Sequence, residues 1–439
     1  MAEVTIEGDT IAAIATAAGV GGVGIVRVSG PRAIAIVEQV LGGELDRSVR
    51  VAWARDRAGT RIDQVLAFGM RAPASFTGED VAELQGHGGA QNLERLLAAV
   101  IERGARVAEP GEFTRRAVLN GKLDLLRAEA LLEVIHAGSE RAWRLAQANL
   151  GGKLGDVAAE LEARTLHVLG EIEGRIDFPD DDLGPEEARV LDAELQELAE
   201  RCATLAAGFR HGRAIQRGIT IALVGPVNAG KSSLLNALLG KERALVAPEP
   251  GTTRDYLEVN DVWDGIAVTL VDTAGMRGTQ DPVEARGIEL GEQRVADADV
   301  VVVVNDGVAP WNDGSRYGSR ALVVRSKADL GGDTRGALAT SATSRQGLDA
   351  LVQRALELAG VAGREGSEDA FVTTARQHAL TVTARDGLAA AVAARNAGQV
   401  AEVVALELRQ AIGALTQLRG TEVGDRVLDE VFARFCIGK

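Results

Sequence analysis

The stretch Gly225-Pro226-Val227-Asn228-Ala229-Gly230-Lys231-Ser232 has the glycine, lysine and serine spacing of a phosphate-binding loop. An apolar run at residues 219–224 precedes it and should form a strand, and a Leu-rich run at residues 233–239 follows and should form a helix. In this arrangement backbone N–H groups and the helix N-terminus surround a phosphate. This context makes a chance glycine-rich turn a poor explanation. We therefore predict a nucleotide site, with Lys231 on the β- and γ-phosphates and Ser232 on Mg²⁺.

Two motifs further along the chain supply groups for the metal and the γ-phosphate. Gly251-Thr252-Thr253-Arg254-Asp255 offers Thr253, whose hydroxyl can complete the Mg²⁺ shell and sense the γ-phosphate. Asp272-Thr273-Ala274-Gly275 stands at the end of an expected apolar strand. Asp272 would hold the metal through water, and the Gly275 N–H would face the γ-phosphate.

The last two motifs predict which base is bound. In Ser326-Lys327-Ala328-Asp329, the Asp329 carboxylate can accept two hydrogen bonds from N1 and the exocyclic amine of guanine, which adenine does not offer. Ser341-Ala342-Thr343 would lie against the base from the other side. Ser326 stands where Asn is usual, so we expect a modest loss of affinity and no change of base. The residues predicted to contact GTP are Asn228, Ala229, Gly230, Lys231, Ser232, Ser233, Ala247, Thr252, Thr253, Asp272, Thr273, Ala274, Gly275, Ser326, Lys327, Asp329, Ser341, Ala342 and Thr343.

The residues that would accelerate hydrolysis are less evident from the sequence. Met276 occupies the position of the catalytic Gln of Ras-type proteins, and no arginine finger can be assigned. Such a finger supplies about 10³–10⁵ in rate, so fast turnover would need a substitute. Asn228 is a candidate ligand for a monovalent cation. The residues alone leave open whether Glu284 orients the attacking water or is an ordinary solvated carboxylate.

Composition narrows the class of protein. The chain has 439 residues and a net charge of −15, which suggests two to four domains and argues against a broad basic surface for nucleic acid. Its two cysteines, Cys202 and Cys436, do not indicate a disulfide framework. The N-terminus lacks the features of a signal peptide, and we found no membrane-spanning run. We expect a soluble cytoplasmic protein in which Cys202 is structural.

The pattern of strand-like and helix-forming sequence changes three times along the chain, which predicts a multidomain α/β and α protein. Short apolar strands separated by helices at 219–224, 266–271, 300–304 and 321–325 favour a mostly parallel sheet covered on both faces. Helix-forming sequence flanks this region on both sides, so we expect a P-loop Ras-like GTPase domain inserted in a helical domain. The predicted domains are an N-terminal α/β domain (1–122), a first helical half (123–217), the GTPase domain (218–365) and a second helical half (366–439).

Motifs outside the P-loop region resemble the tRNA modification GTPase MnmE (TrmE) family along essentially the whole chain. A generic GTPase has none of them, so the resemblance is specific. They are Asp9-Thr10-Ile11-Ala12-Ala13, the glycine-rich stretch 21–30, Ser75-Phe76-Thr77-Gly78-Glu79-Asp80, Gly86-His87-Gly88-Gly89, the stretch 110–117, Asn120-Gly121-Lys122-Leu123-Asp124-Leu125, Ile176-Asp177-Phe178-Pro179 and the terminal Cys436-Ile437-Gly438-Lys439.

This resemblance implies a homodimer formed through an N-terminal domain similar to folate-binding modules of aminomethyltransferases. It implies a site for 5-formyltetrahydrofolate lined by Arg27, Glu79, Lys122 and Lys439. Cations suit the glutamate tail of a folate, and a carboxylate suits the donors of its pterin ring. Without the family, all four residues would be taken for ordinary surface ions.

The resemblance also implies K⁺-stimulated GTP hydrolysis, with K⁺ in the place of an arginine finger. Asn228, Ala247, Glu249 and Thr252 would hold K⁺, Ser232 and Thr253 would hold Mg²⁺, and Glu284 would be the catalytic carboxylate. Three positions depart from the family pattern, where Pro226, Val227 and Ala247 replace commoner residues. These departures bear on K⁺ affinity.

The family activity implied is modification of the wobble uridine (U34) of certain tRNAs at carbon 5, of the 5-carboxymethylaminomethyl type. The implied partner is a flavin-dependent protein of the MnmG (GidA) type. Cys436 would act in this chemistry, because a nearby lysine favours the thiolate. The alternative is a small buried residue at a helix end.

Two other classes of function stay open at this point. One is a binding switch, such as a ribosome-assembly GTPase, with no chemistry beyond hydrolysis. The other is a stand-alone folate-dependent aminomethyltransferase. The Cys436 terminus and the folate-like N-terminal domain argue against the first, and the P-loop argues against the second.

Overall fold

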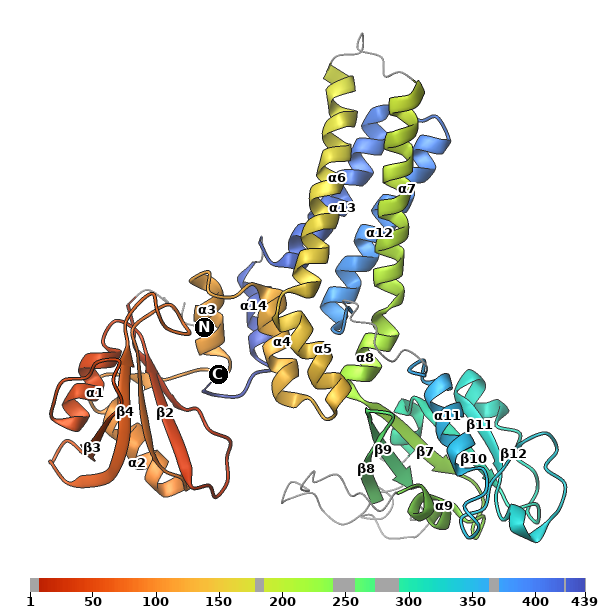
Figure 1. The fold of residues 1–439 in the computed structure, drawn as a ribbon, viewed down its shortest axis with the longest axis horizontal. Coiled ribbons are helices and arrows are strands. Elements are labelled where there is room, and N and C mark those ends of the chain that lie inside the picture. Colours follow the sequence, from red (N-terminus) through yellow and green to blue (C-terminus); the bar gives the residue numbers. More distant parts are fainter. Residues whose placement is uncertain are drawn as a thin grey trace. The chain divides into compact units, whose positions relative to one another are not determined.

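The computed structural model describes residues 8–177, 185–239, 257–272, 292–362, 371–421 and 424–438 (Figure 1). The chain divides into two compact units, Met1–Leu132 with Arg419–Lys439, and Glu133–Leu418. Each is described by itself. Among the described residues, no helix combines the length and apolar character that crossing a membrane requires.

The first unit is built on a six-stranded sheet in the order β3-β4-β5-β2-β1-β6. All neighbours are antiparallel except β1 and β6, which are parallel. The strands are β1 (Ile11–Ile14), β2 (Val23–Ser29), β3 (Arg50–Arg55), β4 (Arg61–Met70), β5 (Val81–His87) and β6 (Arg106–Val107).

Apolar side chains alternate along these strands, because successive residues point to opposite faces of a sheet. On one face, Val26, Val65 and Leu84 pack with α1 (Ala33–Leu41) and α2 (Ala90–Ile101) in a buried core. On the other face, Ile11 and Ala13 of β1 pack with Phe113 of α3 (Glu112–Leu119). That second face is covered at the β1 end.

The described C-terminal residues belong to the first unit. Phe432 of α14 (Asp425–Phe432) and the following Phe435 pack with Leu125 and Ala128 of α4 (Leu125–His136) in a small apolar cluster. The rings of Phe432 and Phe435 lie 5.4 Å apart. The chain therefore returns to its N-terminal unit after Leu418, and the bounds of the second helical half (366–439) stay a prediction.

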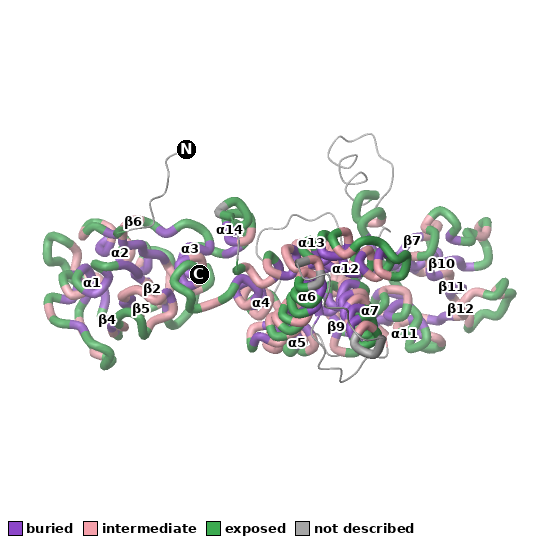
Figure 2. Tube along the Cα trace, turned by 90° about the horizontal axis from the view of Figure 1, so that it is seen from above, coloured by how far each residue is buried: buried purple, intermediate pink, exposed green. Residues whose placement is uncertain are grey.

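The second unit contains the inserted α/β domain that the sequence predicts. Its six-stranded sheet has the order β12-β11-β10-β7-β9-β8 and is parallel except for β8. All six residues of β10 are buried, as expected of a strand covered on both faces (Figure 2). The elements are β7 (Ile219–Val224), α9 (Lys231–Leu238), β8 (Leu257–Trp263), β9 (Ile266–Asp272), β10 (Val300–Asn305), η2 (Ser315–Arg320), β11 (Ala321–Arg325), η3 (Ala328–Leu330), β12 (Leu338–Ala339) and α11 (Leu348–Leu358).

Helices that precede and follow this domain in the sequence pack together, which confirms the insertion. Cys202 of α7 is buried and its thiol donates to the Thr381 carbonyl of α12, and burial raises the thiol pKa to about 11. Cys202 therefore fills a core position, as predicted. The helices of this part are α5 (Glu140–Leu150), α6 (Lys153–Asp177), α7 (Pro185–Ala207), α8 (Phe209–Arg217), α12 (Ala375–Asn396) and α13 (Ala401–Arg419).

Candidate functional site

The phosphate-binding loop joins β7 to α9 and depends on glycine at its first position. Gly225 has φ 148°, and a Cβ there would overlap the Val304 carbonyl oxygen of β10. Gly230 (φ 90°) and Asn228 (φ 63°) also adopt left-handed conformations, which Gly and Asn tolerate best. The backbone therefore turns sharply enough to direct several N–H groups into one concavity before α9 begins at Lys231.

The side chain of Lys231 is held over this loop. Its Nζ donates to the carbonyls of Gly225 and Pro226, each at 2.9 Å, and only 6% of the residue is exposed. Burial lowers the pKa of Lys231, and the nearby Asp272 carboxylate partly opposes that shift. A phosphate entering the loop would add opposite charge beside the buried ammonium, beyond that of Asp272.

Ser232 and Asp272 bring the first and second nucleotide motifs together. The Ser232 hydroxyl donates to Asp272 Oδ2 at 2.7 Å. A hydroxyl and a carboxylate are the oxygen ligands that Mg²⁺ prefers, with phosphate oxygens and waters completing its shell. These two oxygen ligands therefore fit the Mg²⁺ that the sequence predicts at this position.

The third motif is tied directly to the phosphate-binding loop. Ser326 Oγ donates to the Ala229 carbonyl at 2.6 Å, and Lys327 Nζ donates to the Asn228 carbonyl at 2.7 Å. The hydroxyl of Ser326 thus links the loop that is predicted to read the base to the loop that is predicted to hold the phosphates. The residue that replaces the usual Asn still fixes the relative position of the two loops.

The groups expected around the base also lie together. Ser341 Oγ donates to Asp329 Oδ1 at 2.6 Å, and the Ser344 N–H donates to Ser341 Oγ at 3.1 Å. Ala342 and Thr343 lie in the same turn. This arrangement fixes the carboxylate that would read guanine.

Sequence reasoning missed Asp306, which follows β10. Its carboxylate accepts the N–H groups of Val308 and Ala309 and lies 3.7 Å from Lys327 Nζ. The backbone hydrogen bond from Val308, with further help from Ala309 and Lys327, lowers the pKa of Asp306. An acidic residue at the carboxyl end of a buried parallel strand was the available signal, because ligands bind at that edge.

A second group of predicted residues lies in the N-terminal unit. Arg27 Nε pairs with Glu83 Oε1 at 2.9 Å, and its guanidinium lies 5.9 Å from the ring centre of Phe113. Lys122 Nζ donates to the Pro73 carbonyl at 3.0 Å, and the Glu79 carboxylate accepts from Ser29 Oγ at 2.8 Å. All three side chains are at least partly accessible.

The loop that carries Glu79 packs against the segment that carries Lys122. Gly78 has φ 78°, and a Cβ there would lie 3.2 Å from Lys122 Cγ and 3.1 Å from Asn120 Cβ. Asn120 Nδ2 also donates to the Thr77 carbonyl at 2.7 Å. The structure therefore brings Glu79 and Lys122 into one neighbourhood from positions more than 40 residues apart.

The C-terminal segment reaches β1 of the same unit. Ile437 forms an isolated β-bridge with Pro110. Gly438 lies so close to β1 that a Cβ at this position would overlap the Ile14 carbonyl oxygen. Cys436 is exposed, so the alternative of a buried packing residue is wrong. Because β1 pairs with β2, the strand of Arg27, the Cys436 segment lies beside the elements that carry the predicted folate ligands.

Comparison with known proteins decides the family. The MnmE helical domain matches residues 125–436, and the GTP-binding protein TrmE N-terminus matches residues 10–122. A tRNA modification GTPase MnmE from Parasynechococcus marenigrum (strain WH8102) is 44% identical over 98% of this chain and 99% of its own length. The chain belongs to the MnmE family.

A second MnmE relative agrees with this assignment. A tRNA modification GTPase MnmE from Symbiobacterium thermophilum is 40% identical, again over 98% of this chain and 99% of its own length. Among solved structures, the G domain of the T. maritima FeoB iron transporter is 25% identical and covers 32% of this chain and 98% of its own, with a TM-score of 0.25.

Part of the MnmE-type site lies outside the described residues. Lys231, Ser232 and Asp272 are described and lie together, and Asn228 is described and accepts a hydrogen bond from Lys327. The predicted residues that fall outside the described ranges are Ala247, Glu249, Thr252, Thr253, Thr273, Ala274, Gly275, Glu284 and Lys439.

Proposed function

We propose that the protein hydrolyses GTP with Mg²⁺ and K⁺ and, with an MnmG (GidA)-type flavoprotein, takes part in 5-carboxymethylaminomethyl-type modification of the wobble uridine (U34) of certain tRNAs. Similarity to MnmE proteins over 98% of the chain carries the proposal. The contacts among Lys231, Ser232 and Asp272 support its nucleotide part. 5-Formyltetrahydrofolate would supply the one-carbon unit at the Arg27, Glu79, Lys122 and Lys439 group.

Within the GTPase cycle, this chain's residues bind and orient the nucleotide. Lys231 would exchange its two carbonyl acceptors for phosphate oxygens, while Asp329 selects guanine. Mg²⁺ and K⁺ would neutralise the charge that develops around the transferred phosphoryl group. Glu284 would orient the attacking water.

The proposal includes a homodimer formed through the N-terminal unit, and one face of its sheet supports this. Val51 and Leu66 are paired across β3 and β4 and are 62% and 43% exposed, and Trp53 of β3 is 39% exposed. Leu66 alternates with Val65 and Ala67, which face α1 and α2, so it points to the opposite face. Adjacent exposed apolar side chains of this kind mark interaction surfaces.

The proposal also includes a cytoplasmic location, where reducing conditions keep thiols free. Cys202 and Cys436 are both free cysteines. A net charge of −15 suits a protein that shares tRNA binding with a partner.

Nucleoside analysis of tRNA tests the proposal as a whole. A strain lacking the protein should lose the modified wobble uridine, and the wild-type gene should restore it.

Cys436→Ser should leave GTP hydrolysis intact and fail to restore the modification, because the thiol is exposed and available for chemistry. Cys202→Ser serves as the matched control for a buried cysteine. Unchanged tRNA in the deletion strain would reject the proposed function and favour a binding switch, while full restoration by Cys436→Ser would reject only the role of the thiol.

Exchange of the monovalent cation tests the K⁺ part. Replacing KCl by NaCl at constant ionic strength should slow GTP turnover by up to about 10³-fold, the lower end of what an arginine finger supplies. Asn228→Gly removes the side-chain ligand but places a residue there that also tolerates φ 63°. GTP turnover of this variant should be slow in both salts. Equal wild-type rates in KCl and NaCl would reject the K⁺ site.

A further inference from the structure

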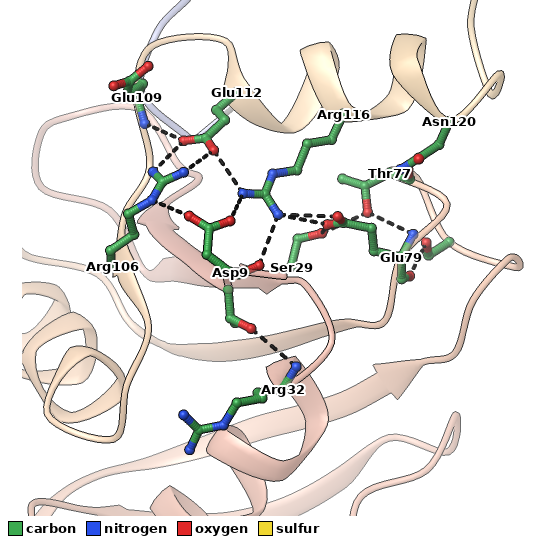
Figure 3. Close-up of polar contacts among 12 residues, drawn as sticks. Asp9, Ser29, Arg32, Thr77, Glu79, Arg106, Glu109, Glu112, Arg116 and Asn120 are labelled. Atoms are coloured by element: carbon green, nitrogen blue, oxygen red, sulfur yellow. Dashed lines mark hydrogen bonds and ion pairs between the residues drawn. The ribbon is translucent and has the colours of Figure 1, made fainter. Parts of the chain in front are cut away.

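Arg116 is the largest side chain that the described residues bury completely, with 1% exposure, and it belongs to the stretch 110–117 whose role the proposed function leaves unexplained. It lies on α3, among carboxylates that come from distant parts of the chain (Figure 3). We name this group the Arg116 cluster. Its members are Asp9, Glu79, Arg106, Glu112 and Arg116.

The two terminal nitrogens of Arg116 serve different partners. One donates to both carboxylate oxygens of Glu79, each at 3.2 Å, and to the Asp9 carbonyl at 3.2 Å. The other donates to Asp9 Oδ1 at 2.6 Å and to Glu112 Oε1 at 2.9 Å. A planar guanidinium can serve both sides because its donors are fixed in a fork, and an ammonium cannot.

The Asp9 and Glu112 side of the cluster is itself held in place. Arg106 donates to both oxygens of Glu112, at 2.8 and 2.5 Å, and to Asp9 Oδ2 at 2.5 Å. The Glu109 N–H donates to Glu112 at 2.9 Å. Burial disfavours the charge of Arg116, but its bonds to Glu112, Glu79 and Asp9 raise its pKa overall. The Arg116 side chain is thus charged and hydrogen-bonded through both terminal nitrogens.

Glu79 is oriented and, like Asp9, still partly accessible, whereas Glu112 is buried. Its Oε2 accepts from Ser29 Oγ at 2.8 Å, and Ser29 Oγ lies 2.7 Å from Thr77 Oγ1. The side chain keeps 20% exposure. A carboxylate has about four lone-pair sites, so the Arg116 and Ser29 bonds leave room for donors from outside.

Retention of such a cluster is not explained by stability alone, since replacing a buried ionic group by packed apolar residues is often neutral or stabilising. A site held at a fixed geometry, in contrast, needs supporting groups behind each ligand-binding side chain. We propose that Arg116 is a positioning residue, which holds the Glu79 carboxylate in one orientation to accept the N–H donors of a folate ring. This inference rests on the proposed function.

The test is a double-mutant cycle on 5-formyltetrahydrofolate binding, measured by titration calorimetry on the full chain. Arg116→Lys keeps the charge but loses the fork, so affinity should fall about tenfold, the equivalent of one hydrogen bond to a charged group. Glu79→Gln should also weaken binding. The double variant should bind no more weakly than Glu79→Gln alone, because Arg116 acts through Glu79. Arg103→Lys is the matched control, since Arg103 is a partly buried arginine of the same unit whose side chain donates to the backbone carbonyls of Ala99, Arg55 and Asp56.

The possible outcomes distinguish failure of the positioning role of Arg116 from failure of the folate site itself. Wild-type affinity in Arg116→Lys, or an equal loss in the presence and absence of Glu79→Gln, would overturn the positioning role and leave the folate site standing. Failure of the wild-type protein to bind the folate would reject the site and the inference together. If Arg116→Lys does not fold, Ser29→Ala provides the same cycle, because it removes the other hydrogen bond that supports Glu79 without changing a charge. If the losses of binding free energy in Ser29→Ala and Glu79→Gln then add up in the double variant, the proposal is overturned.

Discussion

Lys231→Met should weaken the binding of a fluorescent GTP analogue by about 10²–10⁴-fold, because two hydrogen bonds from a charged donor to phosphate are lost, each of about 1.5–3 kcal/mol. In the structure, Nζ is buried against the carbonyls of Gly225 and Pro226. These acceptors are neutral, whereas the phosphates are anionic, so the ammonium is better paired when nucleotide is present.

The same variant should remain folded. Burial lowers the pKa of Lys231, which means that the folded protein disfavours its charged form relative to the unfolded chain at neutral pH. An apolar side chain of similar length removes that cost, so the ligand-free variant should melt at or above the wild-type temperature. Lys153→Met, at the start of α6, is the control and should leave nucleotide affinity unchanged. Wild-type affinity in Lys231→Met would show that the loop at 225–232 does not hold the phosphates.

Glu112→Gln should cost about 3 kcal/mol of unfolding free energy in the N-terminal unit, the lower end of what breaking a buried ion pair costs. Glu112 is 5% exposed and bonds to both Arg106 and Arg116. Asp9 and Glu79 still compensate part of the charge in the variant. Hydrogen exchange of β2 and β5 measures this loss locally, while β10 of the other unit should keep its protection.

The effect should depend on pH in a defined direction. Burial would raise the Glu112 pKa, but hydrogen bonds from Arg106, the Glu109 N–H and Arg116 lower it below its ordinary value. A lowered folded pKa contributes stability above the unfolded pKa, and this contribution is lost as the pH falls through the folded pKa. The wild type and Glu112→Gln should therefore converge in acid. Glu94→Gln, at an exposed position on α2, should change stability by less than about 0.5 kcal/mol at any pH; an equal effect of both substitutions would contradict the account.

The sequence predicted the features that depend on local pattern. The strand 219–224 is β7 at the same residues, and the strands at 266–271, 300–304 and 321–325 agree with β9, β10 and β11 to within one residue. A buried parallel strand is recognisable because it is apolar throughout. The motifs containing Ser232 and Asp272 were predicted to meet because both stand at carboxyl ends of such strands, and their side chains are hydrogen-bonded.

Features that depend on contacts distant in sequence were not predicted. Arg116 meets Asp9 and Glu79, which are 107 and 37 residues away, and no periodicity relates such positions. β8 was missed because its polar residues Asn260 and Asp261 interrupt the apolar pattern of an edge strand. The link from Ser326 to the Ala229 carbonyl was missed for a different reason, since the usual residue there is longer and the reach of a serine depends on how closely the two loops approach.

The packing of α14 on α4 has a consequence for synthesis on the ribosome. Leu125 and Ala128 emerge early, but Leu428, Phe432 and Phe435, which cover them, are made only after the second unit, Glu133–Leu418. At about 5–20 residues per second, roughly 290 intervening residues take about 15–60 s to translate. The N-terminal unit must therefore wait, with an apolar surface uncovered, until α14 has been made, and the exposed thiol of Cys436 reaches its place only after that.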